Sequence, residues 1–264
     1  GIDLNNTVGS VVAANAVVGS DDNGIEQSNA VGALIAANAV GLSGQDGINV
    51  NNAVGVAVAG NIVALSGDDG IDLNNTVGSV VAANAVVGSG DNGIEQSNAV
   101  GSLIALNGIA LSGGDGINVN NAAGLAVVGN GIAGSGDDGI DLNNTIGTLV
   151  AANGVVGSGD NGIEISNAIG TIVALNGVAL SGNDGINIEN AAGLVVLGNA
   201  IAGSGRDGID LRGAVGSLIA GNSILGAGDN GIEVSDAIGT IIILNAVNGT
   251  GGNGIDLTRT LLSL

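Results

Sequence analysis

The sequence lacks cysteine, proline, methionine, histidine and every aromatic residue, and its only basic residues are Arg206, Arg212 and Arg259. Histidine, cysteine and lysine supply most of the activated nucleophiles and proton shuttles that work near neutral pH, so their absence argues against an enzyme. The 24 acidic residues leave a net charge of −21, which excludes a nucleic-acid partner. No apolar run approaches the roughly 18 residues that a membrane span requires.

A repeat of 23 residues runs through the whole chain. The dipeptide Gly-Ile recurs at this interval from Gly1 to Gly254 without an insertion or deletion, giving eleven full repeats and a final stretch of eleven residues. The hydrophobic fraction of 45% is that of a folded domain and not of a disordered acidic tail. A strict period indicates units that stack directly on one another, so we interpret residues 1–264 as a single domain.

Several positions of the repeat never vary, and we number them from 1 at the glycine of each Gly-Ile. Position 9 is Gly and position 15 is Asn in all eleven full repeats. Glycine and asparagine disfavour helix, whereas β-branched residues at the apolar positions favour short strands between tight turns. Parallel stacking at about 4.8 Å per coil predicts a rod on the order of 55 Å long. The residues expected to fill its interior are Ile2, Leu4, Val8, Val12 and Val17 with their equivalents.

The asparagine at position 15 predicts a ladder inside this rod. A buried asparagine at a bend can pass a side-chain hydrogen bond to the asparagine of the next coil. Such a ladder closes only if every coil contributes, as all eleven do here.

The order Gly-Ile-x-Leu, Val-x-x-x-Val, Asn-x-Val and Gly-Ser-Gly-Asp-Asn resembles the right-handed parallel β-helix repeat. It is similar to pectate-lyase-like β-helices and to the passenger regions of bacterial adhesins and autotransporters. The resemblance covers the whole chain and implies an all-β fold, a right-handed parallel β-helix (β-solenoid) of 23-residue coils, eleven full and one partial. It is specific for fold but shared among many functions.

Carboxylates concentrate at positions 3, 22 and 23, which stacking would gather into one acidic edge. Like charges about 5 Å apart repel one another, which favours bound cations. Carboxylates and carbonyls around glycine turns are the oxygen ligands that Ca²⁺ prefers. The candidate calcium ligands are Asp68, Asp69, Asp72, Asp137, Asp138 and Asp141. The alternative is a solvated acidic row that holds no cofactor.

A carbohydrate-active enzyme is the main functional alternative. Asp137 with Asp138, or Asp207 with Asp210, could in principle serve as an acid and base pair. No aromatic residue is present to stack on a sugar, and no histidine or lysine could assist. The irregularity at Arg206 and at Arg212 is explained by ion pairs that relieve the row of aspartates. We therefore predict no catalytic residues.

Apolar residues also occupy positions 11, 13 and 18, which should point outward by alternation with positions 12 and 17. They would leave an apolar strip larger than a monomer usually exposes. The strip predicts self-association, lateral or end to end, or contact with another surface protein. The alternative is a bulge after position 9 that buries position 11 instead.

The function predicted from the sequence is that of a non-enzymatic extracellular or cell-surface β-helix, acting as a stalk, adhesin segment or self-assembling subunit. A second alternative is a calcium-dependent or ice-binding rod, although the outward threonine arrays usual in the latter are missing. Because the chain does not begin with methionine, we interpret it as a processed chain or a fragment. Residues 254–264 form a partial coil, expected to be a cap or a docking segment.

Overall fold

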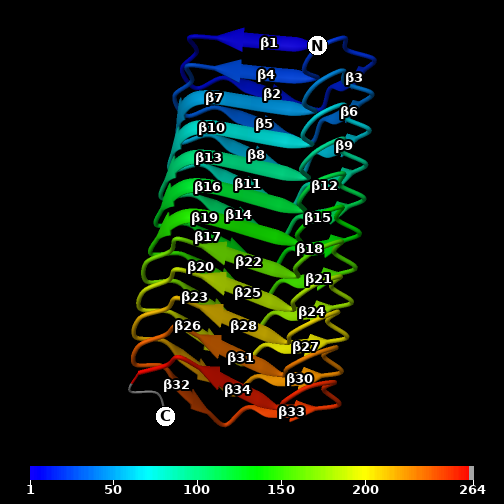
Figure 1. The fold of residues 1–264 in the computed structure, drawn as a ribbon. Helices are drawn as coiled ribbons and strands as arrows, with labels where there is room; N and C mark the ends of the chain where they lie inside the picture. Colours follow the sequence, from blue (N-terminus) through cyan, green and yellow to red (C-terminus); the bar gives the residue numbers. More distant parts are fainter. Residues whose placement is uncertain (262–264) are drawn as a thin grey trace.

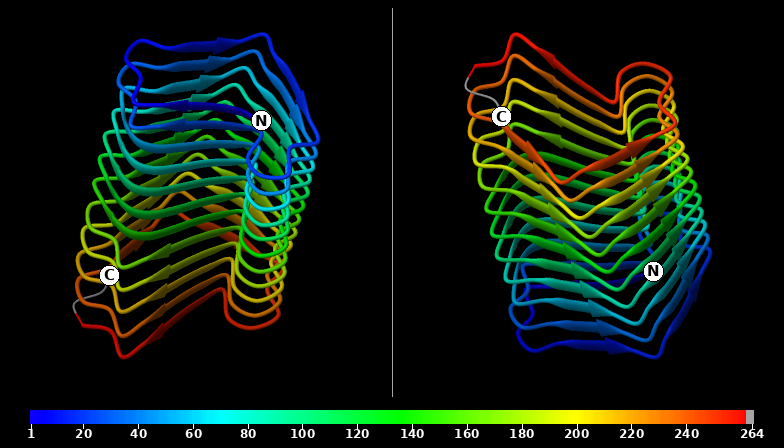
Figure 2. Two further views of the ribbon diagram at one scale, coloured as in Figure 1. Left: turned by 90° about the horizontal axis from the view of Figure 1, so that it is seen from above. Right: turned by 90° about the horizontal axis from the view of Figure 1, so that it is seen from below.

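The computed structural model describes residues 1–261 as a right-handed parallel β-solenoid whose coils stack into a rod (Figure 1). Each full coil contributes one strand to each of three parallel sheets, which we call A, B and C. Every strand pairs with strands 23 residues away, so that identical positions lie above one another, as Val81 lies between Val58 and Ile104. The same outline is kept from one end to the other (Figure 2). The predicted fold class and coil length are confirmed.

Sheet A has 12 strands, and sheets B and C have 11 each. The strands of sheet A are β1 (Ile2–Asn5), β4 (Ile25–Ser28), β7 (Ile48–Val54), β10 (Ile71–Val77), β13 (Ile94–Val100), β16 (Ile117–Ala123), β19 (Ile140–Ile146), β22 (Ile163–Ser166), β25 (Ile186–Glu189), β28 (Ile209–Arg212), β31 (Ile232–Ser235) and β34 (Ile255–Thr258). Those of sheet B are β2 (Val11–Ala13), β5 (Leu34–Ala36), β8 (Ala57–Ala59), β11 (Val80–Ala82), β14 (Leu103–Ala105), β17 (Ala126–Val128), β20 (Leu149–Ala151), β23 (Ile172–Ala174), β26 (Val195–Leu197), β29 (Leu218–Ala220) and β32 (Ile241–Ile243). Those of sheet C are β3 (Ala16–Val18), β6 (Ala39–Gly41), β9 (Ile62–Ala64), β12 (Ala85–Val87), β15 (Gly108–Ala110), β18 (Gly131–Ala133), β21 (Gly154–Val156), β24 (Gly177–Ala179), β27 (Ala200–Ala202), β30 (Ser223–Leu225) and β33 (Ala246–Asn248).

The corners of each coil are made by residues with positive φ at positions 6, 9, 14 and 19. In the fifth coil these are Asn98 (φ 54°), Gly101 (64°), Leu106 (58°) and Leu111 (58°). Glycine and asparagine tolerate this left-handed region, whereas leucine rarely adopts it. Along a strand, side chains point alternately inward and outward. At each corner two consecutive residues face outward, so the inward-facing positions beyond the corner are shifted by one residue.

The corners explain where the core prediction holds and where it is wrong. Ile71 and Leu73, at positions 2 and 4, are fully buried, as predicted. Val8 is 83% exposed, and its equivalents also face outward, so the expected burial of position 8 is wrong. Positive φ at positions 6 and 9 turns positions 7 and 10 inward instead, as Thr76 (0% exposed) and Leu125 (2%) illustrate.

Glycine at position 1 is required by close packing and not by its backbone conformation. A Cβ added to Gly139 would collide with Cγ1 of Val155 and come within 2.9 Å of Oγ of Ser158. Val155 and Ser158 lie at positions 17 and 20 of the same repeat, so sheet C packs directly on the backbone that leads into sheet A.

The asparagine ladder predicted at position 15 is confirmed. Asn107 Nδ2 donates to Asn130 Oδ1 over 2.9 Å, and Asn130 Nδ2 donates to Asn153 Oδ1 over 3.0 Å. The same carbonyl oxygens also accept the backbone N–H of the preceding asparagine, as Asn130 Oδ1 does from Asn107. Asn107 Nδ2 gives its second hydrogen to the carbonyl of Val81. The amides therefore satisfy one another along the corner between sheets B and C.

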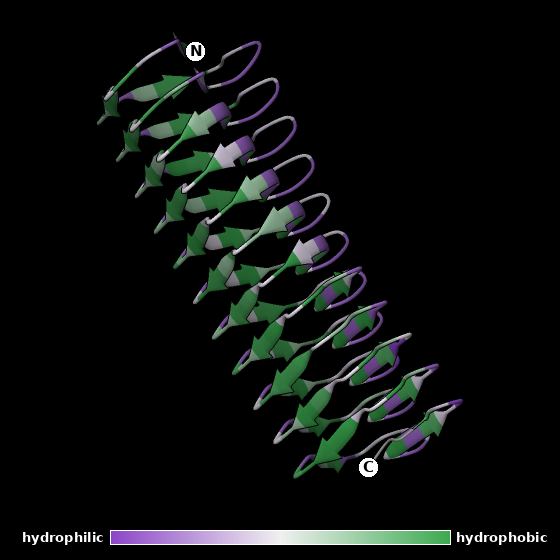
Figure 3. Cartoon of the chain, turned by 90° about the vertical axis from the view of Figure 1, so that its left-hand side faces the viewer, coloured by the Kyte–Doolittle hydropathy of each residue, from purple (hydrophilic) through white to green (hydrophobic). Residues whose placement is uncertain are grey.

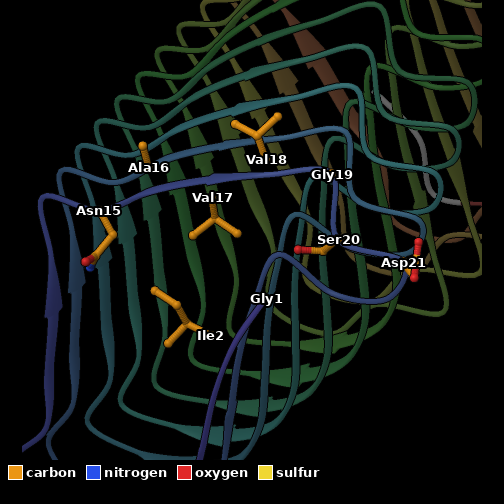
Figure 4. A pocket seen from close by; sticks show the side chains of 9 residues that line it. All are labelled: Gly1, Ile2, Asn15, Ala16, Val17, Val18, Gly19, Ser20 and Asp21. Atoms are coloured by element: carbon orange, nitrogen blue, oxygen red, sulfur yellow. The ribbon is translucent and has the colours of Figure 1, made fainter.

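The two ends of the rod differ. At the first coil, side chains including Ile2, Asn15 and Val17 line a hollow of about 570 Å³ (Figure 4). At the other end β34 pairs with β31, and Leu261 forms a bridge with Ile238. The predicted partial coil thus continues the stack through residue 261, while residues 262–264 lie outside the described residues. Its role as a cap or docking segment stays a prediction. No helix long and apolar enough to cross a membrane occurs in residues 1–261.

Candidate functional site

Charge is confined to one side of the coil. Every Asp, Glu and Arg lies at position 3, 5, 6 or 21–23, and positions 7–20 hold none in any repeat. Sheets B and C occupy positions 11–13 and 16–18, so both are free of charged residues. Figure 3 shows hydrophilic loops along one edge of the rod and hydrophobic strands along the other. We call the column of residues at positions 22, 23 and 3 the acidic row.

The acidic row has an outer and an inner layer. Asp137 at position 22 is exposed, whereas Asp138 at position 23 is only 8% exposed. The expectation of a solvated row therefore holds for position 22 and is wrong for position 23. The turn between sheets C and A brings position 23 back toward the interior beside the invariant glycine.

The inner layer forms a second ladder, which the sequence analysis missed. The backbone N–H of Asp138 donates to Oδ1 of Asp115 over 2.8 Å, and that of Asn161 donates to Oδ1 of Asp138 over 2.7 Å. Only one side-chain oxygen is needed for this ladder, so aspartate and asparagine both fit at position 23. The alternation of these two residue types at one position was the signal that could have revealed it.

Position 23 also faces position 3, which follows three residues later in the next coil. In five of the eight places where one of the two is an amide, that amide donates to the carboxylate of the other. Asn118 Nδ2 lies 2.7 Å from Asp115 Oδ2, and Asn92 Nδ2 lies 3.1 Å from Glu95 Oε2. In every third coil both positions are carboxylates, and no amide can join them. These acid–acid pairs, spaced by 69 residues, are Asp69 with Asp72, Asp138 with Asp141, and Asp207 with Asp210.

One or both members of each acid–acid pair belong to a cluster of three carboxylates whose oxygens lie within 4.8 Å of one another. These clusters are Asp68, Asp69 and Asp91; Asp138, Asp141 and Glu164; and Asp184, Asp207 and Asp210. Of the six residues proposed from the sequence, four therefore lie in such clusters. Asp72 and Asp137 are not members of these three groups. The acidic clusters could hold a metal ion. The third cluster was missed because its signal is the 69-residue spacing of the acid–acid pairs. Glu164 has no such signal, since its equivalents Glu95 and Glu233 belong to none of these three groups.

Burial disfavours ionisation in these clusters. It raises the pKa of Asp138 to about 8 and that of Asp141 to about 7, with further contributions from the neighbouring charges of Asp115 and Glu164. Burial likewise raises the pKa of Asp210 to about 6, although the nearby Arg212 opposes the shift. The folded chain thus holds protons at pH values where free aspartate has lost them.

Arginines accompany only the third cluster. Arg206 Nη2 lies 3.9 Å from Asp207 Oδ2, and Arg212 Nη2 lies 3.2 Å from Asp210 Oδ2. Arg212 also reaches Glu189 over 3.4 Å. The predicted ion pairs are present, and they bring positive charge to a cluster in which Asp207 and Asp210 are almost completely buried.

The two aspartate pairs considered for catalysis have unsuitable geometry for a polysaccharide. Asp137 is exposed while Asp138 points inward, so the two carboxyl groups do not face one cleft. Asp207 and Asp210 are 0% and 2% exposed, so a sugar chain could not contact both. General acid and base catalysis on a glycosidic bond needs both carboxyl groups at the substrate.

The uncharged faces carry exposed apolar side chains. Position 11 faces outward, as Ile172 (43% exposed) shows, so the alternative of a bulge that buries it is wrong. On the outer face of sheet C a shallow hollow of about 520 Å³ lies over β21, β24, β27 and β30. Leucines stand exposed at the corners that border this face, and all have positive φ: Leu42, Leu65, Leu106, Leu111, Leu175, Leu180 and Leu244.

Comparison with known proteins gives one family. The model of the NosD family, described as periplasmic copper-binding protein, matches residues 1–156 and 114–261. No match is found among curated proteins. The family's name implies copper, whose ligands in proteins are chiefly imidazole, thiolate and thioether groups. This chain has no His, Cys or Met, so its donor set does not fit copper.

Solved structures with the same fold include a tailspike protein and two epimerases. The Dettilon tailspike protein gp208 superposes with a TM-score of 0.74 at 16% identity, over 97% of this chain and 61% of the tailspike. The A-module of mannuronan C-5 epimerase AlgE6 from Azotobacter vinelandii gives 0.68 at 13% identity, over 99% of this chain and 80% of the module. A variant of the periplasmic alginate epimerase AlgG gives 0.62 at 13% identity, over 96% and 77%. At such identities the likeness shows the fold alone.

Proposed function

The chain belongs to the NosD family of periplasmic copper-binding proteins, and we propose that it serves as a non-enzymatic structural rod outside the cytoplasm that packs side by side with a second copy. The outer face of sheet C, together with its bordering leucines, is the contact surface. The observation that carries this proposal is the set of leucines held exposed in a left-handed conformation beside an uncharged face.

These leucines reduce the stability of the isolated chain. A left-handed conformation costs a residue other than glycine about 1–2 kcal/mol. Glycine occupies the same position in other coils, such as Gly198 next to Leu175 and Gly203 next to Leu180, so the fold itself does not need leucine there. Strain of this kind is typical of functional sites. Leu175 and Leu180 are 67% and 64% exposed, and contact with a partner would bury them.

The distribution of charge favours a second copy as the partner. A cationic protein would be attracted to the acidic row and not to a face without charge. Two copies that meet through sheet C keep their acidic rows away from the interface, and their coils have the same spacing. A face about 50 Å long and about 15 Å wide offers on the order of 800 Å² per rod, which is the area that a standard interface buries on each side.

Light scattering across protein concentration tests the association. We expect the wild-type mass to rise with concentration. A variant in which asparagine, which tolerates positive φ, replaces four leucines should weaken association at least tenfold, because each buried leucine contributes about 1.5 kcal/mol or more. The four residues are Leu106, Leu111, Leu175 and Leu180.

The matched control replaces four exposed apolar residues at position 8, away from sheet C, by asparagine: Val77, Val100, Ile146 and Ile169. This control should associate as the wild type does. A wild-type chain that stays monomeric at every concentration, or a control that dissociates as readily as the leucine variant, would show that sheet C is not the interface.

An enzyme acting on polysaccharide remains the alternative function, since two of the similar structures are epimerases by name. The burial of Asp207 and Asp210 and the lack of aromatic residues favour the structural role. Turnover of an acidic polysaccharide by the purified chain would decide for the enzyme. The ice-binding alternative has less support, because Thr148, Thr171 and Thr240 face inward.

We also propose that the acidic row binds calcium. The support is chemical: carboxylate oxygens are hard ligands, and they suit Ca²⁺ better than they suit copper. Calcium would reduce the repulsion within a chain whose net charge is −21. Calorimetric titration of the chain with CaCl₂ tests this, and no heat of binding at 150 mM NaCl would contradict it.

A further inference from the structure

The third carboxylate cluster lies where the eighth, ninth and tenth coils stack. Asp184 and Asp207 occupy position 23 of the eighth and ninth coils, and Asp210 occupies position 3 of the tenth. These residues are 1%, 0% and 2% exposed, and their carboxylate oxygens lie within 4.8 Å of one another. Of the three clusters described above, this one alone consists entirely of buried residues.

Two oxygens of this cluster, Asp207 Oδ2 and Asp210 Oδ1, are buried and have no hydrogen-bond partner among residues 1–261. Asp207 Oδ1 accepts the backbone N–H of Asn230 over 2.7 Å, which leaves Oδ2 outside the ladder of position 23. A buried oxygen that has lost water and gained no donor costs free energy. No other carboxylate in the described part of the chain has such an oxygen, so this cost is concentrated in the third cluster.

The neighbouring amide does not supply the missing donor. At the equivalent place in two earlier repeats, Asn49 Nδ2 and Asn118 Nδ2 each donate to the aspartate three residues before them over 2.7 Å. Asn187 follows Asp184 at the same spacing and pairs in register with Asp210. Its Oδ1 is buried and accepts no hydrogen bond from the residues that the structure describes. Because an amide oxygen can only accept, it adds a further acceptor beside the carboxylates.

The two nearby arginines leave these oxygens without a donor. Arg212 Nη2 donates to Asp210 Oδ2 over 3.2 Å, which is the other oxygen of that carboxylate, and Arg212 is shared with Glu189. Arg206 Nη2 lies 3.9 Å from Asp207 Oδ2, which is too far for a hydrogen bond. Both arginine side chains are about half exposed, so their charges lie on the outer side of the cluster.

We infer that Asp184, Asp207 and Asp210 bind one hard divalent cation, for which calcium is the probe. The inference rests on the proposed binding of calcium by the acidic row and assigns it to one site. Calcium takes six to eight oxygen ligands, among them carboxylate, amide and backbone carbonyl oxygens. A cation would supply the positive partner that Asp207 Oδ2 and Asp210 Oδ1 lack, and Asn187 Oδ1 is available beside them.

Titration calorimetry of the full chain with CaCl₂ at 150 mM NaCl tests the assignment. Asp210→Asn recreates the aspartate–asparagine pair that Asp115 and Asn118 already form, so the variant is expected to fold. It should weaken the tightest calcium-binding event about tenfold or more, because a charged ligand is lost. The matched control is Asp141→Asn, which removes the equivalent carboxylate from a pair without buried unpartnered oxygens and should leave this affinity unchanged. Far-UV circular dichroism checks the fold of each protein.

Removal of an arginine tests the same site in the opposite direction. The charge of Arg212 repels a cation bound at the cluster, so Arg212→Gln should tighten calcium binding about threefold. Arg259→Gln is its control, because Arg259 pairs with Asp236 two coils further along the rod and should affect binding less. Binding that is no tighter in Arg212→Gln than in Arg259→Gln would overturn the site.

The outcomes separate the two proposals. Calcium binding whose affinity is unchanged in Asp210→Asn would overturn the site while leaving binding by the acidic row in place. An equal loss in Asp141→Asn would also overturn the site, because the buried oxygens would then make no difference. No binding by the wild type would overturn both proposals and would mean that protons neutralise the buried carboxyl groups.

Discussion

At the scale of single residues, the residues with positive φ form the corners and so determine the shape of each coil. Asparagine, glycine, and alanine or leucine occupy these positions in most coils. Asparagine fills position 6 in most coils, and glycine fills position 9 in all eleven full coils. Positions 14 and 19 hold alanine, leucine or glycine. The first two choices follow from known preferences for the left-handed region. Leucine at positions 14 and 19 does not follow from these preferences. Each such leucine has positive φ and an exposed side chain, so the backbone conformation at these corners determines which apolar groups lie on the surface.

Replacing such a leucine by glycine should therefore stabilise the chain. Leu175 has φ 58° and is 67% exposed, so Leu175→Gly removes a strained conformation and little buried area. We expect the free energy of unfolding to rise by about 1 kcal/mol, which a higher midpoint of thermal unfolding, followed by far-UV circular dichroism, would report. Ile172→Gly, in strand β23 of the same coil, should lower the midpoint. A loss of stability in Leu175→Gly would mean that its contact with the next coil outweighs the strain.

At the scale of elements, strands of three residues in sheets B and C are too short to be stable alone, and ladders along the rod hold them in register. Each buried asparagine of position 15 both donates to and accepts from its neighbours, so the ladder is continuous from Asn15 to Asn245. A ladder of this kind concentrates its free energy in contacts between coils, as in other repeat proteins.

Interrupting the asparagine ladder in its middle should be costly. Asn130→Ala removes the acceptor of both the backbone N–H and Nδ2 of Asn107 and the donor to Asn153. Because buried groups left without a partner cost about 1–3 kcal/mol each, we expect a loss of about 2 kcal/mol or more. Asn15→Ala, at the end of the ladder, leaves no asparagine before it without an acceptor and should cost less. Equal midpoints of thermal unfolding for the two variants would contradict a cooperative ladder.

The sequence was informative where one residue type repeats and uninformative where corners shift the alternation. Invariant Asn at position 15 predicted a buried ladder, because such a ladder closes only if every coil contributes an amide. Position 8 was misplaced because strict alternation ignores the extra residue at each corner, as the exposure of Val8 shows. Likewise the adjacent residues Asp137 and Asp138 look equivalent in sequence, yet one faces solvent and the other the interior. The acidic edge could thus be predicted, but its division into two layers could not.

At the scale of the whole molecule, charge and apolar surface are separated onto different sides of the rod. The acidic side carries all the charged residues of a chain whose net charge is −21, while sheets B and C remain free of charge. Buried carboxyl groups recur at position 23 along the acidic side of the rod. Each one with a raised pKa makes the free energy of unfolding depend on pH, and these contributions add. The stability of the rod should therefore depend on pH more strongly than that of an ordinary acidic protein.

The rod should lose stability as the pH rises from about 4 to about 8 in the presence of a chelator. The pKa of Asp138 is raised to about 8 and that of Asp141 to about 7, from a usual value of 3.8. In this window the unfolded chain has released protons that the folded chain retains, so the free energy of unfolding falls by about 1.4 kcal/mol per pH unit for each such proton. Asp236, whose pKa Arg259 lowers, acts in the opposite sense only as the pH falls below this window. The measurement is the midpoint of thermal unfolding between pH 4.5 and 8.5.

The variant Asp69→Asn with Asp138→Asn is the control for this pH dependence. Asparagine already occupies position 23 at Asn92 and Asn161, so the ladder of backbone hydrogen bonds can persist in the variant. Since both substitutions remove carboxyl groups whose pKa burial raises, the midpoint should fall less with pH than in the wild type. A wild-type midpoint that rises with pH, or a variant with the same slope, would mean that water or counter-ions relieve these carboxylates in the folded chain and that their burial does not control its stability.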